Sequence, residues 1–234
     1  MSGKIRNKAI LKAAGIAVFA AVLCVGCYDL GIEPSVPTPT VETFVDRRDG
    51  KEYKKVKIGE QVWMAENLNY AADGSVCSYY GCYYDWNTAM NGEHSSNADP
   101  SGVMGVCPDG WHLPSDAEWT ALIDYVGINS SVKLEAMTFD GQKPGKLNHP
   151  DGRDIYGFSA LPGGLGSELS TNFFTNIGQS PPYFWDIGRN GYWWSATEGG
   201  DGSKAWWYMM SGLEEVSHLL YDKHYMLTVR CVHD

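Results

Sequence analysis

The first 27 residues constrain the chain most, because they decide the compartment in which it folds. Residues 1–12 carry four Lys and Arg side chains and no acid, and residues 13–25 form an uncharged, apolar run. This is the layout of a secretory signal peptide. At about 1.5 Å of rise per residue the run spans roughly 20 Å, less than the ~30 Å hydrocarbon core of a bilayer. We therefore expect export, and a permanent membrane-spanning helix is the weaker alternative.

The apolar run ends in the motif Leu23-Cys24-Val25-Gly26-Cys27. It resembles the bacterial lipoprotein signal, in which a Cys after a small residue is lipidated and becomes the mature N-terminus. The resemblance implies a signal peptide over residues 1–26 and an acyl anchor on Cys27, which would hold the protein on a membrane. It departs from the pattern at Cys24, since the expected Leu stands one place earlier. An ordinary secreted protein and an uncleaved anchor are the alternatives.

A proline-rich segment follows Cys27. Residues 34–39 hold three prolines, and residues 28–41 show no apolar periodicity. Such segments favour extended polyproline conformations and act as semi-rigid spacers. We expect residues 27–43 to be a linker that holds one folded domain, residues 44–234, away from the membrane. A ligand for another module is the alternative use of these prolines.

The composition excludes some classes of protein. The chain has 18 Lys and Arg against 28 Asp and Glu, and four of the cations lie in the signal segment. An acidic domain of this kind cannot neutralise a row of phosphates, which argues against nucleic-acid binding. The 27 Gly, 14 Tyr, nine Trp and seven Phe indicate many tight turns around a large aromatic core, so an all-helical bundle is not expected.

Four cysteines remain once the two in the signal motif are set aside, and they are Cys77, Cys82, Cys107 and Cys231. An even number in an exported chain implies disulfides, and four cysteines allow three pairings. The short spacing of Cys77 and Cys82 suits a turn, which leaves Cys107 with Cys231. That bridge would close a loop of roughly 125 residues and stabilise the domain by about 4–5 kcal/mol. A zinc site is the alternative, but no Cys-x-x-Cys follows Cys27 and the His residues are scattered.

Local patterns predict an α+β domain with two or three short helices, short antiparallel strands and a long loop region. Ser115 and Glu118 form a capping box before apolar residues at helical spacing, and Gly127 ends that pattern. Shorter helices are predicted over residues 84–90 and from residue 130 or 131 to 137. Strands are predicted over residues 52–59, 61–64, 192–197, 205–210, 216–219 and 226–232, and a loop over residues 138–190.

Five short sequence segments, or phrases, in the folded part resemble those of a known protein family. They lie at residues 56–70, 107–115, 156–164, 191–198 and 228–232. In order and spacing they resemble the Fibrobacter succinogenes major paralogous domain, a family of many bacterial surface lipoproteins, over about residues 53–233. That family resembles the C-type-lectin-like superfamily, which implies a compact α+β domain with a long loop region. The resemblance also implies Cys107 and Cys231 as half-cystines. The family brings no agreed biochemical activity with it.

Motifs for catalysis are missing from the sequence. It lacks the nucleophile elbow, the His-Glu-x-x-His zinc motif and the glycine-rich phosphate and dinucleotide loops. His112 lies in the phrase at residues 107–115, which we expect to pack into the core, so we interpret this histidine as structural. The superfamily also contains formylglycine-generating enzymes, which depend on reactive late cysteines. The late cysteine here is Cys231, for which we expect an inert disulfide, so a non-enzymatic protein is predicted.

C-type lectins hold sugars through a calcium ion, so side chains with oxygen atoms on turns are candidate calcium ligands. The candidates are Asn148, Asp151, Asp154, Glu198 and Asp201. Hard oxygen ligands on turns suit calcium, although Asp and Asn are also common turn formers. The sugar-binding tripeptides Glu-Pro-Asn and Gln-Pro-Asp and the Trp-Asn-Asp motif are absent. We therefore expect no cofactor, with calcium as the alternative.

The most suggestive binding segment is residues 180–185, in which two prolines precede three consecutive aromatic residues. These three rings cannot easily all point inward, so we expect Tyr183 or Trp185 to be accessible and to bind a ligand. Filling the space beneath the long loop is the alternative role. The sequence thus predicts a lipid-anchored protein of the bacterial envelope, at the outer membrane or cell surface, that binds glycan or another surface protein. An enzyme of envelope or polysaccharide metabolism with convergent carboxylates and a purely structural envelope protein are the alternatives.

We expect Cys27 to carry the lipid anchor. Palmitate labelling of the full chain in bacterial cells should disappear in Cys27→Ser and persist in Cys77→Ser. Label that survives the loss of Cys27 would contradict the lipoprotein interpretation.

Overall fold

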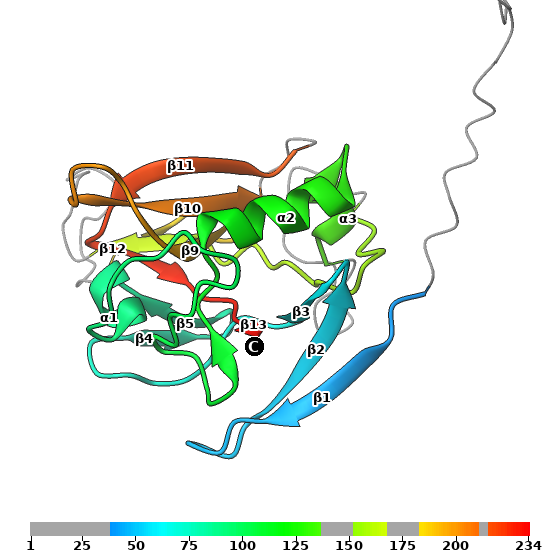
Figure 1. The fold of residues 1–234 in the computed structure, drawn as a ribbon, viewed down its shortest axis with the longest axis horizontal. Coiled ribbons are helices and arrows are strands. Elements are labelled where there is room, and N and C mark those ends of the chain that lie inside the picture. The colour runs from blue at the N-terminus through cyan, green and yellow to red at the C-terminus, as the bar shows by residue number, and fades with distance from the viewer. Residues whose placement is uncertain (1–37, 137–151, 168–182, 211–214) are drawn as a thin grey trace, which may run out of the picture. The chain divides into compact units, whose positions relative to one another are not determined.

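The computed structural model describes residues 38–136, 152–167, 183–210 and 215–234, and Figure 1 shows their fold. From Val36 onward the chain forms one compact unit. The predictions for Cys27, Asn148 and Asp151 lie outside the described residues. No helix within the described ranges has both the length and the apolar character needed to cross a membrane.

A five-stranded sheet contains the predicted hairpin of residues 52–59 and 61–64. Its strands, in spatial order, are β1 (Val41–Val45), β2 (Glu52–Ile58), β3 (Gln61–Met64), β13 (Val232–His233) and β6 (Trp111–His112). β1 begins at Val41, three residues before the predicted start of the folded domain. The reason is that β1 pairs with β2 from Val41↔Val56 onward, and its Phe44 stacks on Trp111 with ring centroids 4.3 Å apart.

The second sheet has eight strands. Its main path runs β11 (Ser217–Asp222), β10 (Lys204–Met210), β9 (Gly191–Glu198), β12 (Tyr225–Thr228), β5 (Gly81–Tyr84) and β4 (Val76–Ser78). Off this path, β7 (Leu165–Ser167) pairs with β12, and β8 (Tyr183–Trp185) pairs with β7. The prediction of antiparallel strands is confirmed except where β12 pairs with β9 in parallel. The described part of the predicted loop region also contains β7 and β8. These strands were not predicted because Gly-rich sequence indicates a loop.

The predicted strand over residues 226–232 is wrong as one element, because it divides into β12 and β13. The residues between these strands are Val229, Arg230 and Cys231, all buried. Arg230 and Cys231 direct their side chains to partners in the interior, so the ladder of one sheet stops and that of the other begins. The chain thereby passes from one sheet to the other at this point.

Three helices are described: α1 (Trp86–Met90), α2 (Asp116–Val126) and α3 (Ser130–Leu134). The capping box of α2 is confirmed, with Ser115 and Glu118 each accepting from the other's backbone amide. α1 starts two residues later than predicted, because Tyr84 belongs to β5 and Asp85 is the N-cap. These observations bear out the α+β class.

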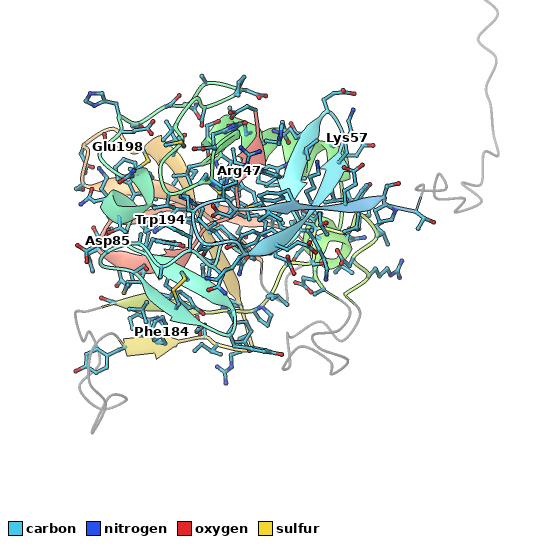
Figure 2. The ribbon with its side chains drawn as sticks, turned by 90° about the horizontal axis from the view of Figure 1, so that it is seen from below. Arg47, Lys57, Asp85, Phe184, Trp194 and Glu198 are labelled. Carbon is cyan, nitrogen blue, oxygen red and sulfur yellow. A yellow bond between two sulfur atoms is a disulfide. The ribbon has the colours of Figure 1, made fainter. Side chains whose placement is uncertain are left out.

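The aromatic residues form two buried clusters, one on each face of β9 and β3. Trp194 and Met64 enter one cluster, whereas the adjacent Trp193 and Trp63 enter the other. Successive side chains on a strand point to opposite faces, so each pair of neighbours serves both clusters. Figure 2 shows Trp194 in the interior, with Lys57, Phe184 and Glu198 nearer the edge. The predicted core role of tryptophan holds for Trp63, Trp86, Trp111, Trp119, Trp193 and Trp194, which are at most 5% exposed.

Both predicted cysteine pairs are disulfide-bonded. Cys107 and Cys231 join the segment before β6 to the segment before β13, with Cα atoms 6.0 Å apart. Cys77 and Cys82 lie opposite each other on β4 and β5 and close the turn between these strands. The first bridge is buried, whereas Cys77 is exposed.

A buried arginine connects three segments of the chain. Arg230 is fully buried and donates to the carbonyls of Phe158 and Ser159 and, at 2.7 Å, to Oδ1 of Asn67. The same Asn67 oxygen accepts the indole N–H of Trp193 at 2.8 Å. The guanidinium also lies over the Phe158 ring, 4.3 Å from its centroid. Burial lowers the pKa of Arg230 to about 9.

We expect Asn67→Ala to lower the free energy of unfolding by about 3 kcal/mol, because it removes the acceptor of the buried Trp193 indole N–H and the shorter of the two hydrogen bonds made by Nη2 of the charged Arg230. Asn87→Ala, at an exposed position of α1, is the matched control and should change stability by less than about 0.5 kcal/mol. Urea unfolding of both variants measures the difference. A loss below about 1 kcal/mol for Asn67→Ala would show that the arginine site tolerates an unpaired donor.

Candidate functional site

A cleft of about 400 Å³ lies between the start of β2, the segment after β3 and the turn from β4 to β5. Lys51, Glu66, Asn69 and Tyr79 are among the side chains that line it, and Leu161 closes one side. Leu161 is the one contribution from the predicted loop region. The other residues come from segments that the sequence analysis had interpreted as framework.

The β4–β5 turn supplies the aromatic side of the cleft. Tyr79 is 60% exposed, and its ring meets that of Tyr80 edge-on, with centroids 5.8 Å apart. The Cys77–Cys82 disulfide closes this turn at its base. An exposed aromatic ring on a covalently closed turn is held in place before any ligand arrives, which reduces the entropy lost on binding.

The turn is also fixed against the body of the domain. The side-chain amide of Asn67 donates to the carbonyl of Tyr80 at 2.8 Å. Gly81, at φ 105°, lies so close to Asn67 that a Cβ there would come within 2.9 Å of the Asn67 side chain. Any larger residue at this position would push the turn outward. The buried arginine site and the cleft therefore share Asn67.

Polar groups form the opposite side of the cleft. Lys51 donates to the carbonyl of Asn69 and lies 3.2 Å from the Asp49 carboxylate. Glu66 accepts from the amide of Lys54 at 2.8 Å, and its side chain is 40% exposed. Tyr53 accepts from the amide of Asn69 at 3.0 Å, and burial raises its pKa to about 12. The cleft thus offers a carboxylate, an ammonium group and a neutral phenol beside the Tyr79 ring.

A second cleft, of about 350 Å³, lies on the far side of the β1–β2 turn. Arg48 lines this cleft: it pairs with buried Asp46 at 2.7 Å, donates to the carbonyls of Val106 and Cys107 and stacks over Tyr70. These contacts hold the β1–β2 turn in place. One wall of the second cleft is therefore anchored through Arg48.

Tyr183 and Trp185, the predicted ligand-binding residues, lie on β8 and are half-buried. Trp185 packs edge-on against Tyr225, with centroids 6.1 Å apart, and adjoins the first core cluster. Phe184, between them, contacts Tyr83 on the other face of the strand. Neither Tyr183 nor Trp185 lines the 400 Å³ cleft. Their role in binding stays a prediction.

The described calcium candidates are each engaged separately. Both Asp154 oxygens accept from Ser159, and burial raises the pKa of Asp154 despite these bonds. Glu198 pairs with Lys223. Asp201 accepts from the backbone and hydroxyl of Ser203, which lower its pKa. Among the described residues, no group of three His, Cys, Asp or Glu could hold a metal ion.

His112 is buried between two carboxylates. Its Nε2 lies 2.6 Å from Oε1 of Glu118, and its Nδ1 lies 2.8 Å from Oδ1 of Asp234. The other Glu118 oxygen accepts from the amides of Ser101 and Ser115. This network joins the α2 capping box to the C-terminal strand. The contacts support the structural interpretation of His112.

The part of the chain that contains the five phrases matches a known protein family. Residues 56–233 match the model of the Fibrobacter succinogenes major domain. The chain belongs to this family. No curated protein and no solved structure matches it. In this member of the Fibrobacter major domain family, residues 56–70, 156–164, 191–198 and 228–232 meet at Arg230, which gives four of the phrases a common physical role.

The sequence analysis of this Fibrobacter major domain missed Tyr79 and Tyr80. Two adjacent tyrosines between cysteines five residues apart were a usable signal, because a turn closed by a disulfide has no interior in which to bury them. The polar side of the cleft carried no such signal. Lys51, Glu66 and Asn69 lie just outside the predicted β2–β3 hairpin, and the local pattern of that hairpin does not show that their side chains meet in one cleft.

We expect the His112 network to make the domain less stable as the pH rises. Burial would lower the pKa of His112, but its hydrogen bonds to Glu118 and Asp234 outweigh burial and raise it above 6.5. The folded state therefore binds the proton more tightly, so the stabilisation is complete below pH 6.5 and is lost as the pH passes the raised value.

Urea unfolding of the wild type and of His112→Gln across this pH range measures the effect. The difference between the two free energies should shrink toward alkaline pH. His94→Gln, at an exposed loop position, should follow the wild-type curve. A pH-independent difference for His112→Gln would contradict the prediction.

Proposed function

We propose that this protein is a non-enzymatic, lipid-anchored envelope protein that binds a glycan in the cleft beneath Tyr79. One observation carries the proposal: an exposed tyrosine ring, on a turn closed by a disulfide, stands beside carboxylate, amide and ammonium groups in one cleft. Sugars present an apolar C–H face and a rim of hydroxyl groups. A ring beside hydrogen-bonding groups matches both features.

The polar groups of the cleft suit the recognition of hydroxyl groups. The Glu66 carboxylate has acceptor capacity beyond its bond to the Lys54 amide, and Lys51 is a donor only. Hydroxyl groups donate and accept, so a pair of neighbouring hydroxyls can use both side chains. The cleft is open to solvent and close to the surface. This is expected of a site that binds one stretch of a long glycan chain rather than enclosing a small ligand.

The anchor and the location are part of the same proposal. The N-terminal motif supports lipidation of Cys27, and the two disulfides fit folding in an oxidising compartment. We place the protein at the outer membrane or the cell surface, where envelope and extracellular glycans are within reach. The relation to C-type-lectin-like domains is likewise proposed, and it is supported by the mixed α+β fold and the bridge from Cys107 to Cys231.

An enzyme acting on polysaccharides is the second candidate, because Glu52 and Glu66 both line the cleft. Paired carboxylates are the usual catalytic groups of glycoside hydrolases. Binding is favoured because both glutamates are accessible to solvent and Glu66 is engaged with Lys54. Product analysis separates the candidates: shortening of a glycan that Glu66→Gln abolishes would favour the enzyme.

We expect Tyr79→Ala to weaken glycan binding by about tenfold, the order of effect seen when an exposed aromatic contact is removed. The unit Val36–Asp234, with its disulfides formed, should first be screened on a glycan array and by pull-down of cell-wall polysaccharide. Tyr125→Ala is the control, because Tyr125 is 58% exposed on α2 and does not line the cleft. Thermal melting should change little in either variant.

The same screen tests the sequence prediction for β8. Tyr183→Ala and Trp185→Ala should bind normally if the cleft is the site, and they should bind weakly if β8 is. Equal losses in Tyr79→Ala and Tyr125→Ala, or no retained glycan, would contradict the proposed function.

A further inference from the structure

Strand β11 forms the outer edge of the eight-stranded sheet, as Figure 1 shows. It pairs with β10 over six positions, from Met209↔Ser217 to Lys204↔Asp222. Within the described residues its other edge pairs with no strand. An unpaired edge of this length offers backbone donors and acceptors to another strand.

The remaining sheet edges are short or charged. β4, β6 and β8 have three, two and three residues, and β1 carries Glu42, which pairs with Lys55 at 3.2 Å. Such features hinder pairing with another chain. β11 has neither Lys nor Pro, and its Leu219 and Tyr221 are 53% and 38% exposed. It is thus the edge best suited to pairing.

We propose that β11 pairs with β11 of a second copy, antiparallel, about a two-fold axis at Leu220. In this register His218 lies opposite the partner's Asp222, and Leu219 lies opposite the partner's Tyr221. Because the axis repeats each pair, the strand makes two imidazole–carboxylate contacts and two apolar ones. Shifting the register by one residue would place Leu219 opposite Leu220 and remove both contacts between His218 and Asp222. The strand is therefore complementary to itself in one register.

The neighbours of His218 favour this pairing. Its Nδ1 lies 3.1 Å from Oδ1 of Asp116, and its ring stacks on Trp206 with centroids 5.0 Å apart. These contacts fix the imidazole, and when both ring nitrogens carry a proton Nε2–H donates to the carboxylate of the second copy. Asp222 lies opposite Lys204 in β10 but forms no ion pair in the part of the chain that the structure describes. Directly opposite side chains of opposite charge stabilise a strand pair.

Sedimentation equilibrium of Val36–Asp234 tests the proposal. The wild type should be a dimer at micromolar concentration. Leu219→Lys should raise the dissociation constant at least about tenfold, because it places an ammonium group against an apolar neighbour and charges the edge. Val45→Lys is the control, since Val45 is also 53% exposed but lies on β1. It should leave the dimer intact.

The register is tested by cross-linking in the full domain. Leu220→Cys should give a covalent dimer on oxidation, since the two copies of this position meet on the axis. Ser217→Cys should not, because its two copies lie on opposite sides of the axis. A monomeric wild type, a dimer insensitive to Leu219→Lys or cross-linking at 217 rather than 220 would each overturn the proposal. Binding of an extended peptide to a monomeric β11 would likewise overturn it, in favour of a different partner strand.

Discussion

The burial of one arginine governs how this domain is assembled. A guanidinium group loses much of its hydration energy on burial, so it is tolerated only where acceptors are already in place. Arg230 finds them in the adjacent carbonyls of Phe158 and Ser159 and in Asn67, which come from two parts of the chain distant from each other and from Arg230. The lowering of its pKa to about 9 reflects that cost. Because the segments must meet for the charge to be accommodated, the site enforces one arrangement of the two sheets.

Local patterns predicted the elements whose causes are local. The capping box at Ser115 needs residues only three positions apart, and the β2–β3 hairpin is a direct alternation across a two-residue turn. The division of the last strand into β12 and β13 could not be predicted in this way. The division occurs because Arg230 and Cys231 bond to partners in other parts of the chain. The alternation of side chains alone predicts one continuous strand over residues 226–232.

The candidate site shows the same limit more strongly. Tyr79 and Tyr80 between their cysteines were a sequence signal for the aromatic side of the cleft. The binding site was instead predicted from the aromatic run at residues 183–185. Exposure was predicted there because three consecutive rings after two prolines cannot easily all point inward. Trp185 instead packs on Tyr225, a residue supplied by a strand that is distant in sequence. Exposure is a property of tertiary packing, so the sequence alone could not predict how far each ring of this run is buried.

The cleft and the self-complementary strand lie at opposite ends of one sheet. The main path runs from β11 to β4, and the β4–β5 turn carries the Tyr79 ring. Pairing through β11 would place two such turns at the two ends of a continuous sheet of twelve strands. At about 4.8 Å per strand they would lie roughly 50 Å apart. A polymer that repeats along its length can occupy both clefts at once, and the second contact then forms at a high effective concentration. If the cleft binds glycan as proposed, pairing through β11 would strengthen binding to a long chain, because the paired sheet would fix the spacing of two copies.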